Sequence, residues 1–267
     1  MVFINGVLER TALATDRGLL YGDGIFRTVE CHAGRPRWWS YHYRCLAHDV
    51  ASLGLPLPDE AVLLDEIYQL TACYPRAVAK VIVTRGESQR GYAIPDDLCP
   101  TRMVYATPWS GYPKVWWQGI TVRLCDFSLA IQPRLAGIKH LNRLEQVLAR
   151  SEWSDPSIQE GLLRDSEGFF VEGTMTNLFL LKDERWVTPL LDRCGVSGAF
   201  RAWMHDHYDV IEQRVTLEAI INAEVVLLGN SLTGPCQVKQ LMGVCCWRPS
   251  SLVPSINRHF SSDAGSA

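Results

Sequence analysis

The chain has 267 residues, of which 47% are hydrophobic and 21% charged, and its formal net charge is −3 at pH 7. These values are ordinary for a globular protein with a real core, and the length allows one large domain or two modest ones. The small net charge and the absence of a long apolar stretch give no reason to expect nucleic acid or a membrane as a partner.

The first part of the chain, 1–110, alternates between strand and helix patterns. Its expected elements are, in order, a hairpin over 2–8, a glycine-punctuated loop over 16–24, strand 25–31, helices 41–53 and 60–72, and strands 78–84 and 102–106. Leu46, Val50 and Leu53 form the apolar stripe of the first helix, and Asp59 caps the second. This pattern predicts a small α+β domain.

The residues 111–118 have little regular pattern, and we interpret them as an interdomain linker. Beyond them the expected elements are strand 120–124, a helix that ends near Trp153, hairpins over 162–171 and 177–188, a helix opened by 195–198, strands near 210 and 224–228, a helix near 217–222, a hairpin over 237–246 and a helix capped by Ser250. Many strands with few parallel crossovers predict a mixed sheet and not a doubly wound fold.

The N-terminal segment, Met1 to Gly6, lacks the basic region and the long apolar run of a signal peptide. The nine cysteines are scattered and show neither a CxxC motif nor metal-ligand spacing. An odd number of scattered cysteines indicates free thiols in a reducing compartment. We therefore expect a cytoplasmic protein without a metal site.

Lys139 stands between a glycine-containing loop and an expected amphipathic helix, in which Leu141, Leu144 and Leu148 fall on one face. The chain has five lysines among its 26 basic residues, so each lysine is worth examining. A lysine that forms an imine needs a fixed, partly desolvated position, where the pKa of its ammonium group falls. Spacing alone also fits a surface lysine near the start of a helix.

Four other segments have the chemistry of an anion or acid site. They are Arg44 in a helix, Glu172 after an apolar strand, and the small-residue turns 195–198 and 230–234. The two turns predict free backbone N–H groups that a phosphate can approach, and Arg44 would add a bidentate partner. Each segment also has an ordinary structural interpretation. Together with Lys139 they predict a site for a phosphorylated aldehyde.

The segment Gly137-Ile138-Lys139-His140-Leu141-Asn142-Arg143-Leu144-Glu145-Gln146 resembles the cofactor-lysine segment of the aminodeoxychorismate lyases. These are fold-type IV pyridoxal-phosphate enzymes, together with the branched-chain and D-amino-acid aminotransferases. The resemblance covers nearly the whole chain, through Phe3-Ile4-Asn5-Gly6, Tyr21-Gly22-Asp23-Gly24, Thr84-Arg85-Gly86, Glu172-Gly173 and Asn177-Leu178-Phe179.

This resemblance implies an α+β chain of two domains. A small N-terminal domain (1–110) precedes the linker at 111–118, and a larger C-terminal domain (119–267) with a mixed, barrel-like sheet carries the cofactor lysine. It also implies a homodimer that acts on a small-molecule substrate.

The resemblance assigns Lys139 as the Schiff-base lysine and general acid–base, and Glu172 as the carboxylate that pairs with the pyridine nitrogen. Its phosphate cradle is implied at Val196, Ser197 and Ser231. Arg44 is similar to the phosphate arginine of a His-x-x-Arg-Leu pattern, although counting from His42 puts the arginine place on Cys45.

For the substrate, Arg90 is similar to an arginine that holds a carboxylate in the D-amino-acid aminotransferases, and Phe26, Thr28 and Tyr92 are expected near it. The roles of Arg27 and Asn142 stay open.

The implied reaction converts 4-amino-4-deoxychorismate into 4-aminobenzoate and pyruvate, a step toward folate. The main alternative is a D-amino-acid or branched-chain aminotransferase on the same fold. Phe26 stands where the former have a tyrosine, and the Asn-Tyr pair that follows the lysine in the latter is missing. An alternative from another class is a non-catalytic, colourless binding module for a small anion.

Overall fold

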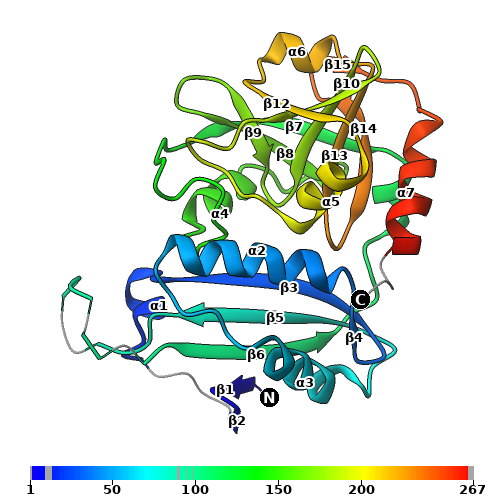
Figure 1. Cartoon of the computed structure of the whole chain (residues 1–267). Coiled ribbons are helices and arrows are strands. Elements are labelled where there is room, and N and C mark those ends of the chain that lie inside the picture. Colours follow the sequence, from blue (N-terminus) through cyan, green and yellow to red (C-terminus); the bar gives the residue numbers. More distant parts are fainter. Residues whose placement is uncertain (1, 10–13, 89–90, 95, 98, 264–267) are drawn as a thin grey trace. The chain divides into compact units, whose positions relative to one another are not determined.

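The structure is a computed structural model that describes residues 2–9, 14–88, 91–94, 96–97 and 99–263. Its internal contacts divide the chain into two compact units (Figure 1). The first unit comprises 1–110 and the short segment 138–142, and the second comprises 111–137 and the chain from 143 through the C-terminal helix. No helix among the described residues is both long and apolar enough to cross a membrane.

The first unit is built on an antiparallel sheet with the order β2-β1-β6-β5-β3-β4. Its strands are β1 (Val2–Ile4), β2 (Val7–Glu9), β3 (Gly24–His32), β4 (Arg35–Pro36), β5 (Arg76–Thr84) and β6 (Thr101–Pro108). β3 and β5 pair without interruption from Gly24–Thr84 to His32–Arg76. Because side chains alternate along a strand, Ile25, Arg27 and Val29 point to one face of this sheet.

That face is covered by the helices α2 (Trp39–Ser52) and α3 (Glu60–Thr71), while α1 (Arg17–Tyr21) precedes β3. The carboxylate of Asp59 accepts a hydrogen bond from Val62 N (3.1 Å), so the predicted cap of the second helix is confirmed. The buried face of α2 contains not only Leu46 and Val50 but also His42 and Asp49. Polar side chains thus lie among the apolar side chains on the buried face of α2.

The second unit contains a mixed sheet in which several strands form a closed ring. Around the ring the order is β10, β13, β14, β7, β8 and β9, and β9 pairs again with β10. The strands are β7 (Ile120–Leu129), β8 (Glu160–Asp165), β9 (Phe170–Gly173), β10 (Asn177–Lys182), β11 (Arg185–Pro189), β12 (Val210–Gln213), β13 (Val225–Asn230), β14 (Gly234–Leu241) and β15 (Cys245–Cys246). β7 pairs in parallel with both β8 and β14.

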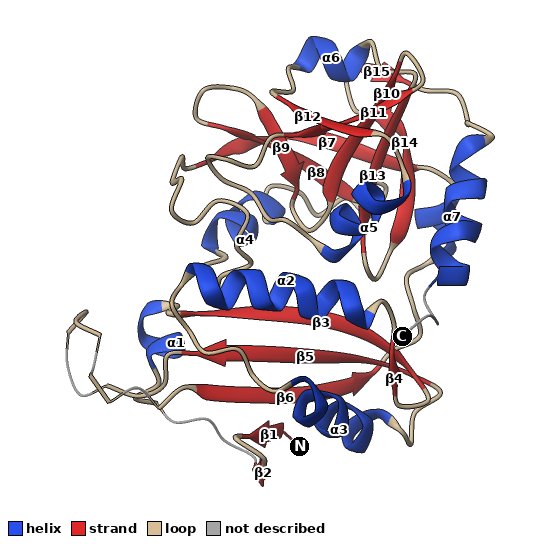
Figure 2. Cartoon of the chain, viewed as in Figure 1, coloured by secondary structure: helices blue, strands red, loops and turns tan. Residues whose placement is uncertain are grey.

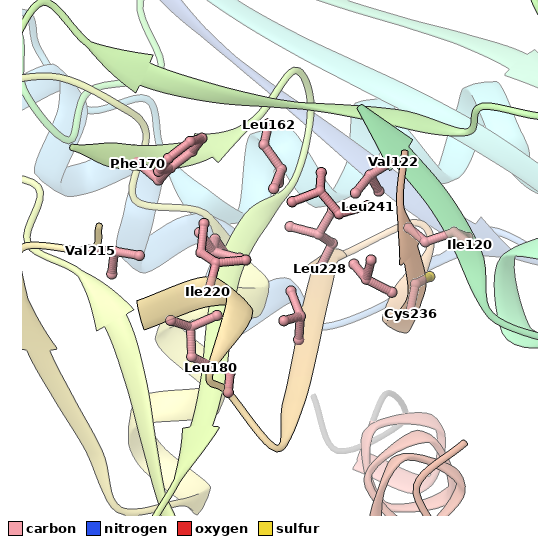
Figure 3. Close-up of a cluster of buried hydrophobic side chains, with 14 of the residues drawn as sticks. Ile120, Val122, Leu162, Phe170, Leu180, Val215, Ile220, Leu228, Cys236 and Leu241 are labelled. Atoms are coloured by element: carbon pink, nitrogen blue, oxygen red, sulfur yellow. The ribbon is translucent and has the colours of Figure 1, made fainter. Parts of the chain in front are cut away.

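The core of the second unit consists largely of aliphatic side chains from these strands, with Phe170 and Ile220 among the other residues packed there (Figure 3). Leu162, Leu228 and Val122 are fully buried there and come from three different strands of the ring. The helices of this unit are η1 (Lys114–Trp117), α4 (Leu144–Arg150), α5 (Ala199–His207), α6 (Leu217–Ile221) and α7 (Leu252–Asp263) (Figure 2). The hydroxyl of Ser250 accepts a hydrogen bond from Leu252 N (3.2 Å), as its predicted role as a cap requires.

Three details differ from the sequence-based expectations. The helix after Lys139 starts only at Leu144 and ends at Arg150, and its apolar residues Leu144 and Leu148 are exposed. The residues 111–118 belong to the second unit, because Trp116 packs into its core. The lysine segment packs with the first unit, although the larger C-terminal domain was expected to carry it.

Candidate functional site

Lys139 lies in the segment 138–142, which pairs with the beginning of β3. Phe26 N donates to Lys139 O (3.0 Å), and Leu141 N donates to Gly24 O (2.9 Å). The backbone on both sides of Lys139 is therefore held in an extended conformation. This pairing is the reason that the helix begins later than predicted. It also fixes the backbone position from which the Lys139 side chain extends.

Asp49 of α2 holds the same backbone from the side of the core. Its Oδ2 accepts a hydrogen bond from Lys139 N (3.1 Å) and an ion-paired hydrogen bond from the Arg27 guanidinium. The side chains of Arg27 and Asp49 are 4% and 1% exposed. Removing one partner of a buried pair leaves an uncompensated charge, which is costly. Arg27 therefore keeps the Asp49 carboxylate in the position where it binds the backbone N–H of Lys139.

The amine of Lys139 lies over an aromatic ring. Its Nζ is 4.8 Å from the centroid of Phe26, and the Nζ of Lys80 is 4.7 Å from the same centroid. A ring face attracts cations, so Phe26 orients both amines. Thr28 lies two residues further along β3, on the same face of the sheet, and pairs with Lys80 in register. The structure thus brings Lys139, Phe26 and Lys80 together, with Thr28 beside them.

His42 is buried beneath this region, and neither of its ring nitrogens has a hydrogen-bond partner within the described part of the chain. Burial lowers the pKa of His42 to about 3, and the positive charges of Arg27 and Lys139 act in the same direction. The imidazole is therefore neutral at physiological pH.

In the second unit, Glu172 and Asn177 form hydrogen bonds with the backbone N–H and C=O of Val196. Glu172 Oε2 accepts a hydrogen bond from Val196 N (2.8 Å), and Asn177 Nδ2 donates to Val196 O (2.7 Å). Glu172 and Asn177 are register partners, and their pairing closes the ring of strands. The predicted carboxylate is thus a buried part of this closure, 4% exposed.

The turn over 195–198 forms a parallel bridge with Gly137. Gly137 N donates to Gly195 O (3.0 Å), and Ser197 N donates to Gly137 O (2.9 Å). The N–H groups of Val196 and Ser197 therefore both have acceptors, which corrects the expectation that this turn leaves them free. Gly195 has φ +86°, and a Cβ there would lie 2.6 Å from Val171, so the turn requires glycine.

The loop after β13 is shaped by the side chain of Asn230. Asn230 Oδ1 accepts hydrogen bonds from Leu232 N and Thr233 N (2.8 Å each), as in an Asx turn. Its Nδ2 donates to Met175 O (3.0 Å). Ser231, the third predicted cradle residue, is buried in this loop.

Arg44 lies on the exposed side of α2, with its guanidinium 4.9 Å from the centroid of Tyr41. Cys45, at the arginine place of the motif, is buried, and burial raises the pKa of its thiol. A different arginine lies against it: Arg27 donates to Cys45 O (2.9 Å).

Of the other predicted residues, Tyr92 is 83% exposed, and its ring meets that of Tyr21 at 5.2 Å. Arg90 lies outside the described residues. Asn142, whose role was open, donates to Gly22 O (3.2 Å).

Sequence reasoning missed Asp49, Asn177 and Glu160. Asp49 stands three residues after Leu46 on an apolar stripe, and a carboxylate at such a position signals a buried partner. Glu160 opens an apolar strand in the same way, and it is fully buried. Asn177 has no comparable signal, because its role depends on a turn that brings it beside Glu172.

Comparisons with known proteins agree with this arrangement. The family model "Amino-transferase class IV" matches residues 24–241. An aminodeoxychorismate lyase of Vibrio harveyi is 31% identical over 244 residues, which is 89% of this chain and 90% of that protein. A D-alanine aminotransferase of Bacillus licheniformis is 25% identical over 91% of this chain and 88% of its own length.

Among solved structures, 4-amino-4-deoxychorismate lyase from Pseudomonas aeruginosa superimposes with a TM-score of 0.92. It is 38% identical, and the match covers 98% of this chain and 99% of that one. The predicted α+β architecture of fold type IV is thereby confirmed.

Proposed function

Because the chain belongs to the amino-transferase class IV family, we propose that it is a pyridoxal-phosphate-dependent lyase. The proposed reaction converts 4-amino-4-deoxychorismate into 4-aminobenzoate and pyruvate. We choose a lyase because the chain matches two aminodeoxychorismate lyases over almost its full length. Lys139 and Glu172 would serve a lyase and an aminotransferase alike.

The residues present fit the cofactor. Lys139 offers an amine on a backbone that is fixed from two sides, and Glu172 offers a buried carboxylate. Ser197 and Ser231 add hydroxyl groups in two ordered turns. An amine, a carboxylate and hydroxyl donors are the groups that a phosphorylated pyridine aldehyde requires.

When bound, the cofactor supplies a ring that takes up the electrons of a broken C–H bond. Lys139 removes the proton from C4 of the substrate. The C–O bond of the enolpyruvyl ether on the adjacent carbon then breaks, and the substrate ring becomes aromatic. Lys139 is also our candidate to protonate the pyruvate methylene. The hydrogen-bonded backbone of Lys139 fixes the point from which this amine extends.

Glu172 would pair with the pyridine nitrogen of the bound cofactor, and its negative charge would favour the protonated form of that nitrogen. A carboxylate about 4 Å from a cationic nitrogen contributes roughly 4 kcal/mol in a partly shielded site. Glu172 now accepts the N–H of Val196 (2.8 Å). We propose that Val196 would lie beside the phosphate of the bound cofactor, with its backbone held by Glu172.

Arg44 is the residue that we propose to bind the cofactor phosphate, because it lies near the arginine place of the His-x-x-Arg-Leu motif. The structure adds Arg27 as an alternative, because its guanidinium is buried and lies against the carbonyl of Cys45, the residue at the arginine place. On the substrate side we assign Phe26, Thr28, Tyr92 and Arg90, following the motif.

We also propose a homodimer in the cytoplasm. Leu144, Val147 and Leu148 form one face of α4, and they are 74%, 58% and 51% exposed. Apolar side chains at this helical spacing normally cover a partner, and a second copy of the chain is the proposed partner. All nine cysteines are free thiols, which suits a reducing compartment.

The experiment that tests the function measures both products of the lyase reaction. Purified protein with pyridoxal phosphate and aminodeoxychorismate is expected to release 4-aminobenzoate and pyruvate in equal amounts. The second candidate, an aminotransferase, is supported by the similarity to the D-alanine enzyme. It predicts glutamate from D-alanine or leucine with 2-oxoglutarate. Glutamate formation without pyruvate release from aminodeoxychorismate would replace the lyase proposal.

A further inference from the structure

Glu160 is a buried carboxylate to which the proposed reaction assigns no role. It is the first residue of β8, and its side chain accepts several hydrogen bonds from the protein around it. Its donors are the backbone N–H groups of Gly161 (2.9 Å), Thr174 (3.0 Å) and Met175 (3.3 Å) and the hydroxyls of Thr174 and Thr176 (3.1 Å for the latter).

These contacts place Glu160 beneath the turn that joins β9 to β10. Gly173 lies so close that a Cβ on it would be 3.0 Å from the side chain of Glu160 and 2.2 Å from Thr176 Oγ1. Burial raises the pKa of Glu160, while the hydrogen bonds act to lower it. Backbone N–H groups can only donate, so the turn needs the acceptor oxygens of this carboxylate.

The turn supports two parts of the candidate site. On one side it sets Glu172 opposite Asn177, and this pair holds the peptide of Val196. On the other side Met175 O accepts a hydrogen bond from Asn230, the residue that shapes the loop containing Ser231. Glu172, the 195–198 turn and the 230–233 loop are thus linked through one buried carboxylate.

We propose that Glu160 is a positioning residue that holds the ring-nitrogen carboxylate and both proposed phosphate-binding turns in register. This inference rests on the proposed function in its reference to the cofactor. The physical link between Glu160 and the three segments can be measured without the cofactor.

The same strand provides a matched control. Asp165 is the last residue of β8, it is 2% exposed, and its Oδ1 accepts hydrogen bonds from Glu167 N and Phe169 N (3.0 Å each) in the hairpin turn that it begins. Asp165→Asn therefore removes a buried carboxylate from a turn at the opposite end of β8. None of these hydrogen bonds involves the candidate site.

The first measurement is amide hydrogen exchange on the protein without cofactor. Glu160→Gln is expected to speed exchange at least tenfold at Thr174 and Met175, and also at Val196 and Thr233. Asp165→Asn is expected to speed exchange only in its own turn. Faster exchange confined to 173–176 in Glu160→Gln would overturn the link to the other segments.

The second measurement is the affinity for pyridoxal phosphate, followed by its absorbance. Glu160→Gln is expected to bind about ten- to a hundredfold more weakly than the unchanged protein, and Asp165→Asn within threefold of it. An unchanged affinity in Glu160→Gln, or an equal loss in Asp165→Asn, would overturn the positioning role. If the unchanged protein does not bind pyridoxal phosphate, the proposed function fails, while the exchange data still decide the link.

Thr176→Val provides a milder variant if Glu160→Gln does not fold. It keeps the carboxylate and removes one hydroxyl donor. We expect the same pattern of exchange, at Val196 as well as within the turn, with a smaller change. No change at Val196 in this variant would contradict the proposal.

Discussion

Asp49 accepts a hydrogen bond from the backbone N–H of Lys139, although the two residues are 90 positions apart in the sequence. The same carboxylate pairs with Arg27. A single acid on the buried face of α2 therefore ties the proposed catalytic lysine to the core of the first unit. The geometry of the amine depends on this helix as much as on the segment that contains it.

Two lysines lie against the ring of Phe26, and only one of them should carry the cofactor. Lys139→Ala is expected to abolish both the visible absorbance of the bound cofactor and the release of pyruvate. Lys80→Ala, which removes the other amine at the same ring, is expected to keep the absorbance. Borohydride treatment should add the mass of the cofactor to the peptide containing Lys139. Its addition to the Lys80 peptide would contradict the assignment.

Asp49→Asn tests the anchor of the lysine. Breaking a buried ion pair by removing one partner costs about 3–5 kcal/mol, and we expect a loss of this size in the unfolding free energy from urea titration. The control is Asp209→Asn, which breaks the exposed pair Arg185–Asp209, with side chains 56% and 62% exposed. That change should cost less than about 1 kcal/mol. Equal losses would mean that Asp49 contributes no more than a surface acid.

His42 should make stability depend on pH. The pKa of His42 is about 3 in the folded protein, against an ordinary value of 6.5 for histidine, so the unfolded chain binds the proton more readily. The contribution of His42 is fully present above pH 6.5 and is lost as the pH falls toward 3, by up to about 1.4 kcal/mol per pH unit. His42→Leu should flatten this slope, whereas the exposed His48→Gln should preserve it. A slope that is unchanged in His42→Leu would exclude this cause.

Arg44 and Arg27 are both proposed to bind the cofactor phosphate, and separate substitutions distinguish them. Removing a charge-assisted hydrogen bond costs about 1.5–3 kcal/mol. The variant that lacks the phosphate-binding arginine should therefore bind pyridoxal phosphate roughly ten- to a hundredfold more weakly than the unchanged protein. Affinity for pyridoxal, which lacks the phosphate, should not change. Arg44→Met and Arg27→Met are measured side by side, with Arg27→Lys as the milder variant. If neither loses affinity selectively, both assignments fail.

The exposed face of α4 should control assembly. Leu148→Glu places a charge on the proposed interface, and we expect it to convert a dimer into a monomer in analytical ultracentrifugation. Val62→Glu introduces the same charge at another exposed apolar position, 39% exposed on α3, and should leave the dimer intact. A monomeric unchanged protein, or a dimeric Leu148→Glu variant, would remove α4 from the interface.

The sequence predicted most helices and strands because local signals such as the Asp59 cap and the apolar stripe of α2 agree with the final packing. Its interpretation of 141–148 was partly wrong, because the backbone from 138 to 142 pairs with β3 before any helix can start. That pairing is a tertiary contact, and no local periodicity encodes it. The exposure of the leucines of α4 was not predicted for the same reason. Sequence spacing shows that a helix has an apolar face, but it does not show what covers that face.

For the candidate site, motif matching named Lys139, Glu172, Val196 and Ser197. It did not show that the N–H groups of the last two already have acceptors. The supporting roles of Asp49, Glu160 and Asn177 were missed, because each side chain binds a backbone group outside its own helix or strand. Which acid reaches which peptide is decided by strand register and helix packing.

The first unit is completed by the segment 138–142, which follows residues 111–137 of the second unit in the sequence. A recombinant fragment ending at residue 110 would lack the segment 138–142, and the edge of β3 from Gly24 to Phe26 would lose its neighbour. Exchanging residues 1–110 between two related proteins would likewise separate Asp49 from the backbone N–H of Lys139 that it binds in this chain. Ribosomal synthesis therefore cannot complete the first unit before part of the second has been made.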